Sequence, residues 1–182
     1  MATTILLARH GETDWNAARR VQGHTDVPLN DRGREQARAL ADELDDEPLD
    51  AVYASDLLRA HETARIVAER KGMDVIVLPE LRERHFGTWE GLTDTEVLER
   101  YPHARTVTSW GDGETREELS RRILDALERI AEAHPDGRVL VVAHGGPLRV
   151  ALHAAGAEGG REIVNCHVAR LEVEQGRIQA LA

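Results

Sequence analysis

An arginine and a histidine stand side by side at the end of an apolar run near the start of the chain. Residues 4–8 form this run, which predicts a buried strand, and Arg9 and His10 follow it directly. A guanidinium and an imidazole in this place contribute little to a hydrophobic core. They suit an anion site in which the arginine neutralises charge and the histidine offers a nucleophilic nitrogen.

Three later predicted strands are each followed by a residue of matching chemistry: Arg59, Glu83 and His144. Ligands of open α/β sheets bind beyond the carboxyl ends of the strands, so we expect these side chains to meet Arg9 and His10 in one crevice. Two guanidiniums match phosphate oxygens, two imidazoles supply a nucleophile and a donor, and a carboxylate can protonate a leaving oxygen. The set predicts phosphoryl transfer by positioning and charge neutralisation.

Short apolar runs alternate with helical patterns along the chain. The runs that predict strands are residues 4–8, 51–54, 75–78, 139–142, 167–174 and a last one near 178. Stripes at helical spacing predict helices that begin at Asn30, after Ser55 and at about residue 114, with Asn30 and Ser55 as N-caps. The last two strands are expected to form a hairpin. The alternation predicts an α/β three-layer sandwich with a mainly parallel central sheet.

The composition limits which domains, partners and cofactors are expected. With 182 residues, 41% of them hydrophobic, we expect one domain over residues 1–182, with a small irregular insert at about 82–113. The net charge of −10 argues against nucleic acid and anionic membranes as partners. The apolar runs are too short for a membrane span, and the single cysteine allows no internal disulfide and no cysteine-based zinc site. We expect a cytoplasmic protein without a metal or other cofactor; its oligomeric state is not predicted.

The motifs around these residues resemble those of the histidine phosphatase superfamily, which includes cofactor-dependent phosphoglycerate mutase. The resemblance covers nearly the whole chain, with the motifs in the family's order. They are Arg9–Thr13, Gln22–Gly23 with Asp26–Leu29, Ser55–Ala60 with Thr63–Ala64, Leu81–Glu83 with Gly87 and Trp89–Gly91, Gly113–Thr115, Val142–Gly146 and Asn165. This resemblance implies a phosphoglycerate mutase-like fold and a single histidine phosphatase domain.

The resemblance also implies a role for each residue. His10 would attack phosphorus and become phosphohistidine, while Glu83 would protonate the departing alkoxide and later take a proton from water. Three side chains would hold the phosphoryl oxygens: Arg9, Arg59 and His144. Four residues would add substrate contacts: Asn16, Gln22, Gly23 and Gly145. We interpret the other seven histidines as structural or surface residues, with His24 and His85 expected to come nearest the pocket.

The chain departs from the mutase branch where mutases hold the substrate's second charged group. Mutases resemble one another in a lysine at the position of Asp94 and two consecutive arginines at Gly111 and Asp112. The resemblance therefore favours a metal-independent phosphatase acting on a small phosphorylated metabolite. A mutase remains an alternative, because four other arginines could form an anion clamp: Arg82, Arg84, Arg100 and Arg105. A non-catalytic phospho-ligand binding module is a third alternative, which the presence of Glu83 opposes.

Overall fold

The computed structural model describes residues 1–104, 113–157 and 163–181. Within them, the central sheet has the strand order β3-β2-β4-β1-β5-β6. The strands are β1 (Thr3–Arg9), β2 (Ala51–Ala54), β3 (Val75–Val77), β4 (Arg138–Ala143), β5 (Val168–Glu174) and β6 (Arg177–Ala180). Strands β1 to β4 pair in parallel, while β5 runs antiparallel to β1 and forms a hairpin with β6. The predicted sheet and its closing hairpin are confirmed.

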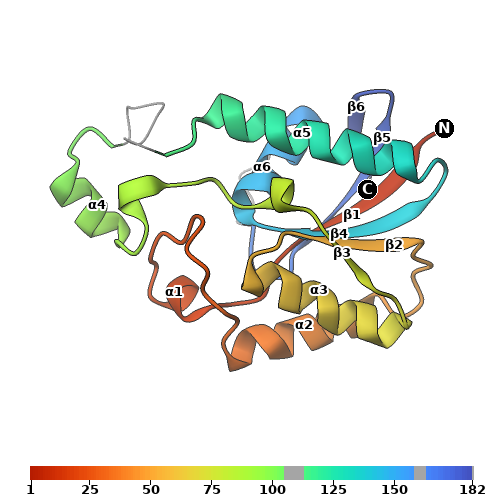
Figure 1. The fold of residues 1–182 in the computed structure, drawn as a ribbon, viewed down its shortest axis with the longest axis horizontal. Helices are drawn as coiled ribbons and strands as arrows, with labels where there is room; N and C mark the ends of the chain where they lie inside the picture. The colour runs from red at the N-terminus through yellow and green to blue at the C-terminus, as the bar shows by residue number, and fades with distance from the viewer. Residues whose placement is uncertain (105–112, 158–162, 182) are drawn as a thin grey trace.

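Helices cover both faces of this sheet (Figure 1). The long helices are α2 (Asp31–Glu43), α3 (Leu58–Lys71), α5 (Arg116–Ala133) and α6 (Gly145–Ala154). Alternate residues of β1 point to opposite faces. Leu6 and Ala8 pack in the cluster under α2 and α3, whereas Ile5 and Leu7 pack in the cluster under α5 and α6. The sheet is thus buried on both sides, which confirms the predicted α/β sandwich.

The helices begin close to the predicted positions, and one predicted N-cap is corrected by the structure. Asn30 caps α2, and Thr115 caps α5 in a capping box. The prediction that Ser55 caps α3 is wrong, because Leu57 occupies the N-cap and makes no side-chain bond there. Ser55 Oγ instead accepts a hydrogen bond from Leu57 N at 3.3 Å, so the serine stabilises the turn before the helix.

Short elements complete the fold. They are α1 (Asp14–Ala17), η1 (Pro79–Leu81), η2 (Gly87–Trp89) and α4 (Asp94–Arg100). Figure 1 shows α1 and α4 at the end of the molecule toward which β1 points. Trp89, Val97 and Ala104 form a small apolar cluster of their own in the segment predicted as an insert. Residues 105–112, including Gly111 and Asp112, lie outside the described residues, and the single-domain boundary remains a prediction. No helix in the described ranges has the length and apolarity needed to cross a membrane.

Candidate active site

His10 is the first residue after β1 and is almost fully buried, with 3% of its surface exposed. Its Nδ1 donates a hydrogen bond to the Gly11 carbonyl oxygen at 2.6 Å. Because a carbonyl can only accept, Nδ1 carries the proton and Nε2 keeps its lone pair. The His10 carbonyl in turn accepts from Asn165 Nδ2 at 3.0 Å. The ring is therefore held with the lone pair on Nε2, as the predicted attack on phosphorus requires.

His144 follows β4 directly, and its ring centroid lies 5.1 Å from that of His10. Burial lowers the pKa of His10 well below its ordinary value, and the charges of Arg59 and Arg9 lower it further. The pKa of His144 is lowered in the same way, by burial first and then by Arg59. Both imidazoles are consequently neutral at pH 7. A neutral ring is what the predicted nucleophile, His10, and the predicted hydrogen-bond donor, His144, each require.

Arg59, on the first turn of α3, is a cation held inside the protein with 1% of its surface exposed. Its Nη2 donates to the Gly23 carbonyl at 2.7 Å and its Nη1 to the Thr25 carbonyl at 2.9 Å. Burial lowers the pKa of Arg59 to about 10, so the guanidinium stays charged at pH 7. Among the described residues, Arg59 Nε and both ring nitrogens of His144 are buried without a hydrogen-bond partner. Such groups are rare in folded proteins, and their gathering near His10 suits the oxygens of a phosphoryl group.

Glu83 is oriented by the N-terminus of α6. Gly146 N donates to Glu83 Oε2 at 3.1 Å, and Arg84 N donates to Glu83 Oε1 at 2.7 Å. A Cβ built on Gly145 would lie 3.8 Å from Arg9 Nε and 4.0 Å from Glu83 Oε2. The Arg9 guanidinium, the Glu83 carboxylate and the start of α6 therefore meet at one place. The structure brings together all five side chains that the sequence selected for catalysis; their roles remain predictions.

The predicted substrate contacts lie in the adjoining loops. Asn16 Oδ1 accepts from Thr13 N at 3.1 Å, and Gln22 Oε1 accepts from Thr13 Oγ1 at 2.8 Å. With their oxygens engaged, the two amide nitrogens are the groups that can donate to a substrate. Gly23 supplies its carbonyl to Arg59, and Gly145 begins α6. Substrate binding by these four residues remains a prediction.

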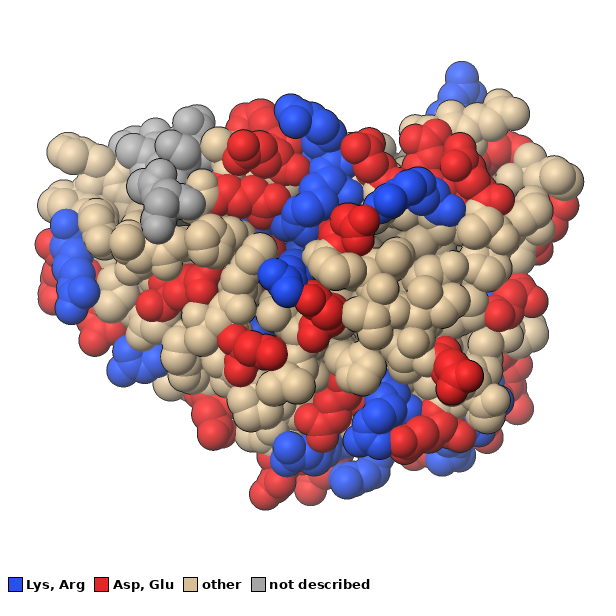
Figure 2. All heavy atoms as spheres, in the orientation of Figure 1, with Lys and Arg blue, Asp and Glu red and all other residues tan. Residues whose placement is uncertain are grey.

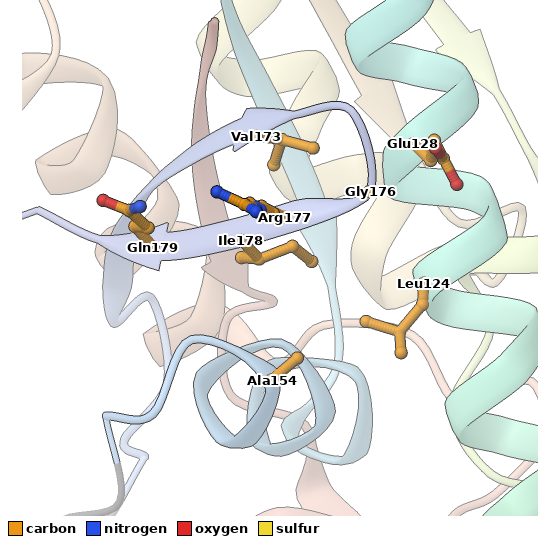
Figure 3. Close-up of a pocket in the computed structure, with 8 residues that line it drawn as sticks. All are labelled: Leu124, Glu128, Ala154, Val173, Gly176, Arg177, Ile178 and Gln179. Atoms are coloured by element: carbon orange, nitrogen blue, oxygen red, sulfur yellow. The ribbon is translucent and has the colours of Figure 1, made fainter.

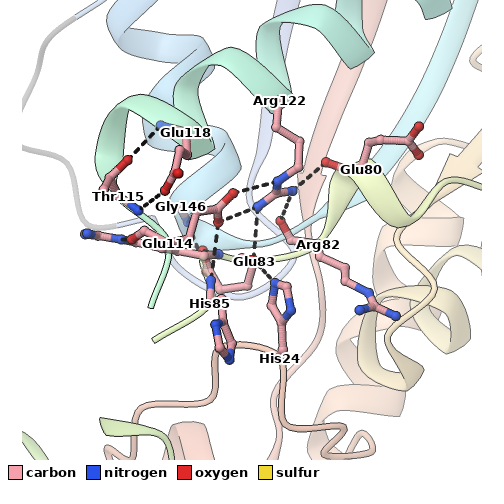
Figure 4. A network of polar contacts seen from close by, with 12 residues as sticks. His24, Glu80, Arg82, Glu83, His85, Glu114, Thr115, Glu118, Arg122 and Gly146 are labelled. Carbon is pink, nitrogen blue, oxygen red and sulfur yellow. Dashed lines mark hydrogen bonds and ion pairs between the residues drawn. The ribbon is translucent and has the colours of Figure 1, made fainter. Parts of the chain in front are cut away.

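Arg122 on α5, to which the sequence analysis assigned no role, clamps the segment that carries Glu83 (Figure 4). Its guanidinium donates to the backbone carbonyls of Glu80, Arg82 and Glu83, at 2.6, 3.0 and 3.3 Å. Glu114 holds it in turn through hydrogen bonds of 2.8 and 2.7 Å. His24 Nε2 donates to the same Glu83 carbonyl at 2.8 Å. His24 thus approaches the site as expected, and the backbone of Glu83 is held from two sides.

Glu90 is a second residue whose role the sequence did not reveal. Its carboxylate accepts hydrogen bonds from His24 N, Thr25 N and Thr25 Oγ1, at 2.9, 2.9 and 2.6 Å, and from Phe86 N at 3.1 Å. It thereby joins the loop that orients Arg59 to the loop that follows Glu83. Both loops lack a helical or strand period, so no sequence pattern indicates this contact.

The described arginines of the alternative anion clamp differ in their surroundings. Arg82 is engaged with Asp56 through hydrogen bonds of 2.7 and 2.5 Å. Arg100 ends α4 in an exposed position, and Arg105 lies outside the described residues. Arg84, with 5% of its surface exposed, lines a pocket next to Glu83.

Of two pockets in the structure, one adjoins the predicted site and the other does not. A pocket of about 970 Å³ includes Glu83 and Gly146 in its lining. A smaller pocket of about 360 Å³ lies between the β5–β6 hairpin and helices α5 and α6 (Figure 3). Its described lining carries Glu128 and Arg177 as charged residues and includes none of the predicted site residues. Among the described residues, no group of His, Cys, Asp or Glu is arranged to hold a metal ion.

Basic and acidic side chains are interspersed on the surface. On the face shown in Figure 2, a run of basic side chains extends from α5 toward the centre, among acidic ones. Since the chain carries 33 acidic and 23 basic residues, such basic regions stand out against a negative background. An anionic ligand is attracted to them locally.

Comparisons with known proteins agree with this geometry. The profile of the histidine phosphatase superfamily (branch 1) matches residues 5–182. Phosphoglycerate mutase-like protein 4 of Arabidopsis thaliana is 44% identical over 155 residues, which are 80% of this chain and 67% of that protein. A metal-independent phosphoserine phosphatase of the same plant is 42% identical over 178 residues, 91% of this chain and 74% of that protein. A solved mycobacterial glucosyl-3-phosphoglycerate phosphatase, complexed with VO3, has a TM-score of 0.88 and 30% identity, covering 98% of this chain and 97% of that one.

Proposed function

Because this chain belongs to the histidine phosphatase superfamily (branch 1) and is a phosphoric monoester hydrolase, we propose that it acts without a metal, through a phosphohistidine on His10. The observation that carries this proposal is the buried, neutral His10 ring, which bonds through Nδ1 and lies beside the Arg59 cation. The substrate is a small phosphorylated metabolite. The phosphatase names of two of the relatives support hydrolysis as the outcome.

In the first step, His10 Nε2 attacks phosphorus and the bond from phosphorus to the ester oxygen breaks. Arg9, Arg59 and His144 hold the three non-bridging oxygens and neutralise their charge. Glu83, protonated at this stage, gives its proton to the departing alkoxide, so that a neutral alcohol leaves. Its link to Gly146 N holds the carboxyl group next to the start of α6.

In the second step, water attacks the phosphohistidine. Glu83, now a carboxylate, takes a proton from this water, and the bond from phosphorus to Nε2 breaks. Inorganic phosphate leaves, His10 returns to its neutral form and Glu83 is again protonated. The two arginines supply the positive charge, and His144 the further donor, that a metal supplies in other phosphatases.

The test measures phosphate release from p-nitrophenyl phosphate with excess chelator present. We expect full activity of the wild-type chain in chelator and a loss of several orders of magnitude in kcat for His10→Ala. His61→Ala, on a half-buried histidine of α3, is the matched control and should keep its activity. Rapid quenching should trap an acid-labile, alkali-stable phosphate on the wild type and none on His10→Ala.

Two results would contradict the proposal: activity that disappears with chelator, or a His10→Ala variant as active as the wild type. A coupled assay on 3-phosphoglycerate with its bisphosphate distinguishes a mutase from a phosphatase. A mutase would isomerise the substrate faster than it releases phosphate. A trapped phosphohistidine that turns over would dispose of the non-catalytic binding module.

A further inference from the structure

The loop of residues 23–25 is attached to the carboxylate of Glu90. Glu90 Oε1 accepts from His24 N at 2.9 Å, while Oε2 accepts from Thr25 N at 2.9 Å and from Thr25 Oγ1 at 2.6 Å. Backbone N–H groups only donate, so both oxygens act as acceptors, as those of an ionised carboxylate do. The side chain of Glu90 is only 13% exposed. A charge so largely removed from water is stabilised by the donors of this loop.

The absence of a side chain at Gly23 makes room for this carboxylate. The φ of Gly23 is +53°, in the left-handed region that favours glycine. A Cβ built on Gly23 would lie 2.1 Å from Glu90 Oε1, so a larger residue there would displace the carboxylate. The Gly23 backbone and the Glu90 carboxyl group are therefore in direct packing contact, and a change at residue 90 is transmitted to the loop.

One peptide group connects Glu90 to Arg59. The peptide between Gly23 and His24 donates its N–H to Glu90 Oε1, and its carbonyl oxygen accepts from Arg59 Nη2 at 2.7 Å. In a trans peptide these two groups point in opposite directions, so the peptide lies between the carboxylate and the guanidinium. Hydrogen bonds in such a chain polarise and strengthen one another. The position of the Arg59 guanidinium thus depends on where Glu90 holds the loop.

The loop engages two donors of Arg59 and leaves a third for a ligand. The carbonyl of Thr25 accepts from Arg59 Nη1 at 2.9 Å, in addition to the bond from Nη2 to Gly23. Within the described ranges, Arg59 Nε is buried without a hydrogen-bond partner. A guanidinium is planar, so fixing its two Nη groups also fixes the direction of Nε. The Nε–H donor is therefore held in one direction before a ligand binds.

We propose that Glu90 is a positioning residue for phosphoryl binding: acting through residues 23–25, it holds Arg59 in the orientation in which Nε donates to a phosphoryl oxygen. The inference rests on the proposed function, in which Arg59 binds the phosphoryl group. Glu90 also accepts from Phe86 N at 3.1 Å, three residues after Glu83. That contact is a second route, through the segment of the predicted acid, and the test distinguishes the two routes.

The test measures the dissociation constant of inorganic phosphate by titration calorimetry and kcat/KM for p-nitrophenyl phosphate. Glu90→Gln keeps the size of the side chain but places an NH2 group against backbone donors, so the loop has to move. We expect phosphate binding to weaken by about tenfold and kcat/KM to fall by a similar factor. The alkaline limb of the pH–rate profile should stay where it is, because Arg122 still holds the Glu83 segment.

A double-mutant cycle with Arg59→Met shows whether Glu90 acts through Arg59. When the guanidinium is absent, Glu90→Gln should lower kcat/KM by less than about twofold, because the two residues act as one unit. An equal loss with and without Arg59 overturns the inference. A displaced alkaline limb with unchanged phosphate binding also overturns it, since Glu90 would then act through the Glu83 segment.

Thr25→Val and Thr25→Ser form a milder pair that leaves Glu90 and Arg59 in place. Valine removes the hydroxyl that donates to Glu90 Oε2, whereas serine keeps a hydroxyl. We expect phosphate binding to weaken by about threefold in Thr25→Val and to stay near the wild-type value in Thr25→Ser. This pair decides the question if thermal melts show that Glu90→Gln or Arg59→Met does not fold. Wild-type phosphate binding in Thr25→Val would then overturn the inference.

Glu96→Gln is the matched control. Glu96 on α4 also accepts from a backbone N–H, that of Thr93 at 2.7 Å, and pairs with Arg20 rather than with the loop of residues 23–25. This variant should bind phosphate as tightly as the wild type. A loss of phosphate binding in Glu96→Gln equal to that in Glu90→Gln would mean that the effect is not specific to Glu90, and would overturn the inference.

The two measurements separate this inference from the proposed function. If the wild type hydrolyses p-nitrophenyl phosphate and the effects of Glu90→Gln and Arg59→Met simply add, this inference fails alone. If the wild type binds phosphate but hydrolyses no ester, the proposed function fails, and the cycle on the phosphate dissociation constants still decides this inference. If it neither binds phosphate nor hydrolyses the ester, both fail.

Discussion

The backbone N–H of Gly146 and the carboxylate of Glu83 are in direct contact, with 3.1 Å between Gly146 N and Glu83 Oε2. A Cβ at residue 146 would lie 2.1 Å from Glu83 Oε1, so the carboxylate occupies the space that a side chain would need. The contact couples the start of α6, which follows His144 directly, to the predicted acid. His144, the neighbour of His10, and Glu83 are thereby both positioned at one helix N-terminus.

Gly146→Ala should therefore lower activity more than stability. The added methyl group displaces the end of the flexible Glu83 side chain rather than backbone, and alanine is a better helix former than glycine. We expect kcat to fall by about tenfold or more, because the proposed proton donor is misplaced, with little change in the midpoint of thermal unfolding. Steady-state kinetics and a thermal melt measure the two effects. Wild-type kcat in this variant would show that the contact does not position Glu83.

Arg122→Met should loosen the segment that carries Glu83. The guanidinium satisfies three backbone carbonyls and pairs with Glu114, so its loss leaves partly buried acceptors and a carboxylate without their partner. We expect a loss of about 2–3 kcal/mol in the free energy of unfolding, a lower kcat and an altered alkaline limb of the pH–rate profile. Arg122→Lys should restore part of the kcat.

Arg129→Met is the comparison for this experiment. Its side chain is 58% exposed and bonds Glu80, so the change should cost about 0.5 kcal/mol or less and leave the pH–rate profile as it is. If Arg122→Met destabilised the protein without changing the pH–rate profile or kcat, the role of Arg122 would be structural alone.

Gly33→Ala should be strongly destabilising. A Cβ there would lie 2.1 Å from the Glu12 carbonyl oxygen, which belongs to rigid backbone two residues after His10. The start of α2 and the loop after β1 would have to separate, at a cost of about 2 kcal/mol or more, and His10 would move with the loop. Chemical denaturation and kcat should both report the change. Arg38→Ala, on the exposed side of the same helix, is the control and should alter neither.

Stability should fall as the pH drops below about 6.5. The pKa of His144 is lowered by burial and by Arg59, so the unfolded chain takes up a proton at a pH where the folded chain does not. The free energy of unfolding then decreases by up to about 1.4 kcal/mol per pH unit for this residue. Denaturation curves between pH 7.5 and 5.5 should show a smaller decrease for His144→Gln than for the wild type. Equal decreases would mean that His144 is protonated in the folded state.

Much of the candidate site was predictable because it lies at strand ends. Arg9, His10 and His144 directly follow apolar runs, and parallel strands bring their carboxyl ends to one edge of the sheet. The helix after β2 was predicted, but its N-cap was not, because Ser55 serves the preceding turn. A strand pattern therefore locates a residue in space better than a capping residue locates a helix start.

The sequence by itself determined which chemical groups this protein has and which edge of the sheet they reach, since both follow from residue type and from local periodicity. The tertiary structure alone decided how they are held. Arg122 bonding the Glu83 segment, Glu90 joining two loops and Gly146 bonding the Glu83 carboxylate all connect residues far apart in the chain through irregular backbone. Such contacts leave no periodic trace, because each depends on the packing of whole elements rather than on the residues next to it.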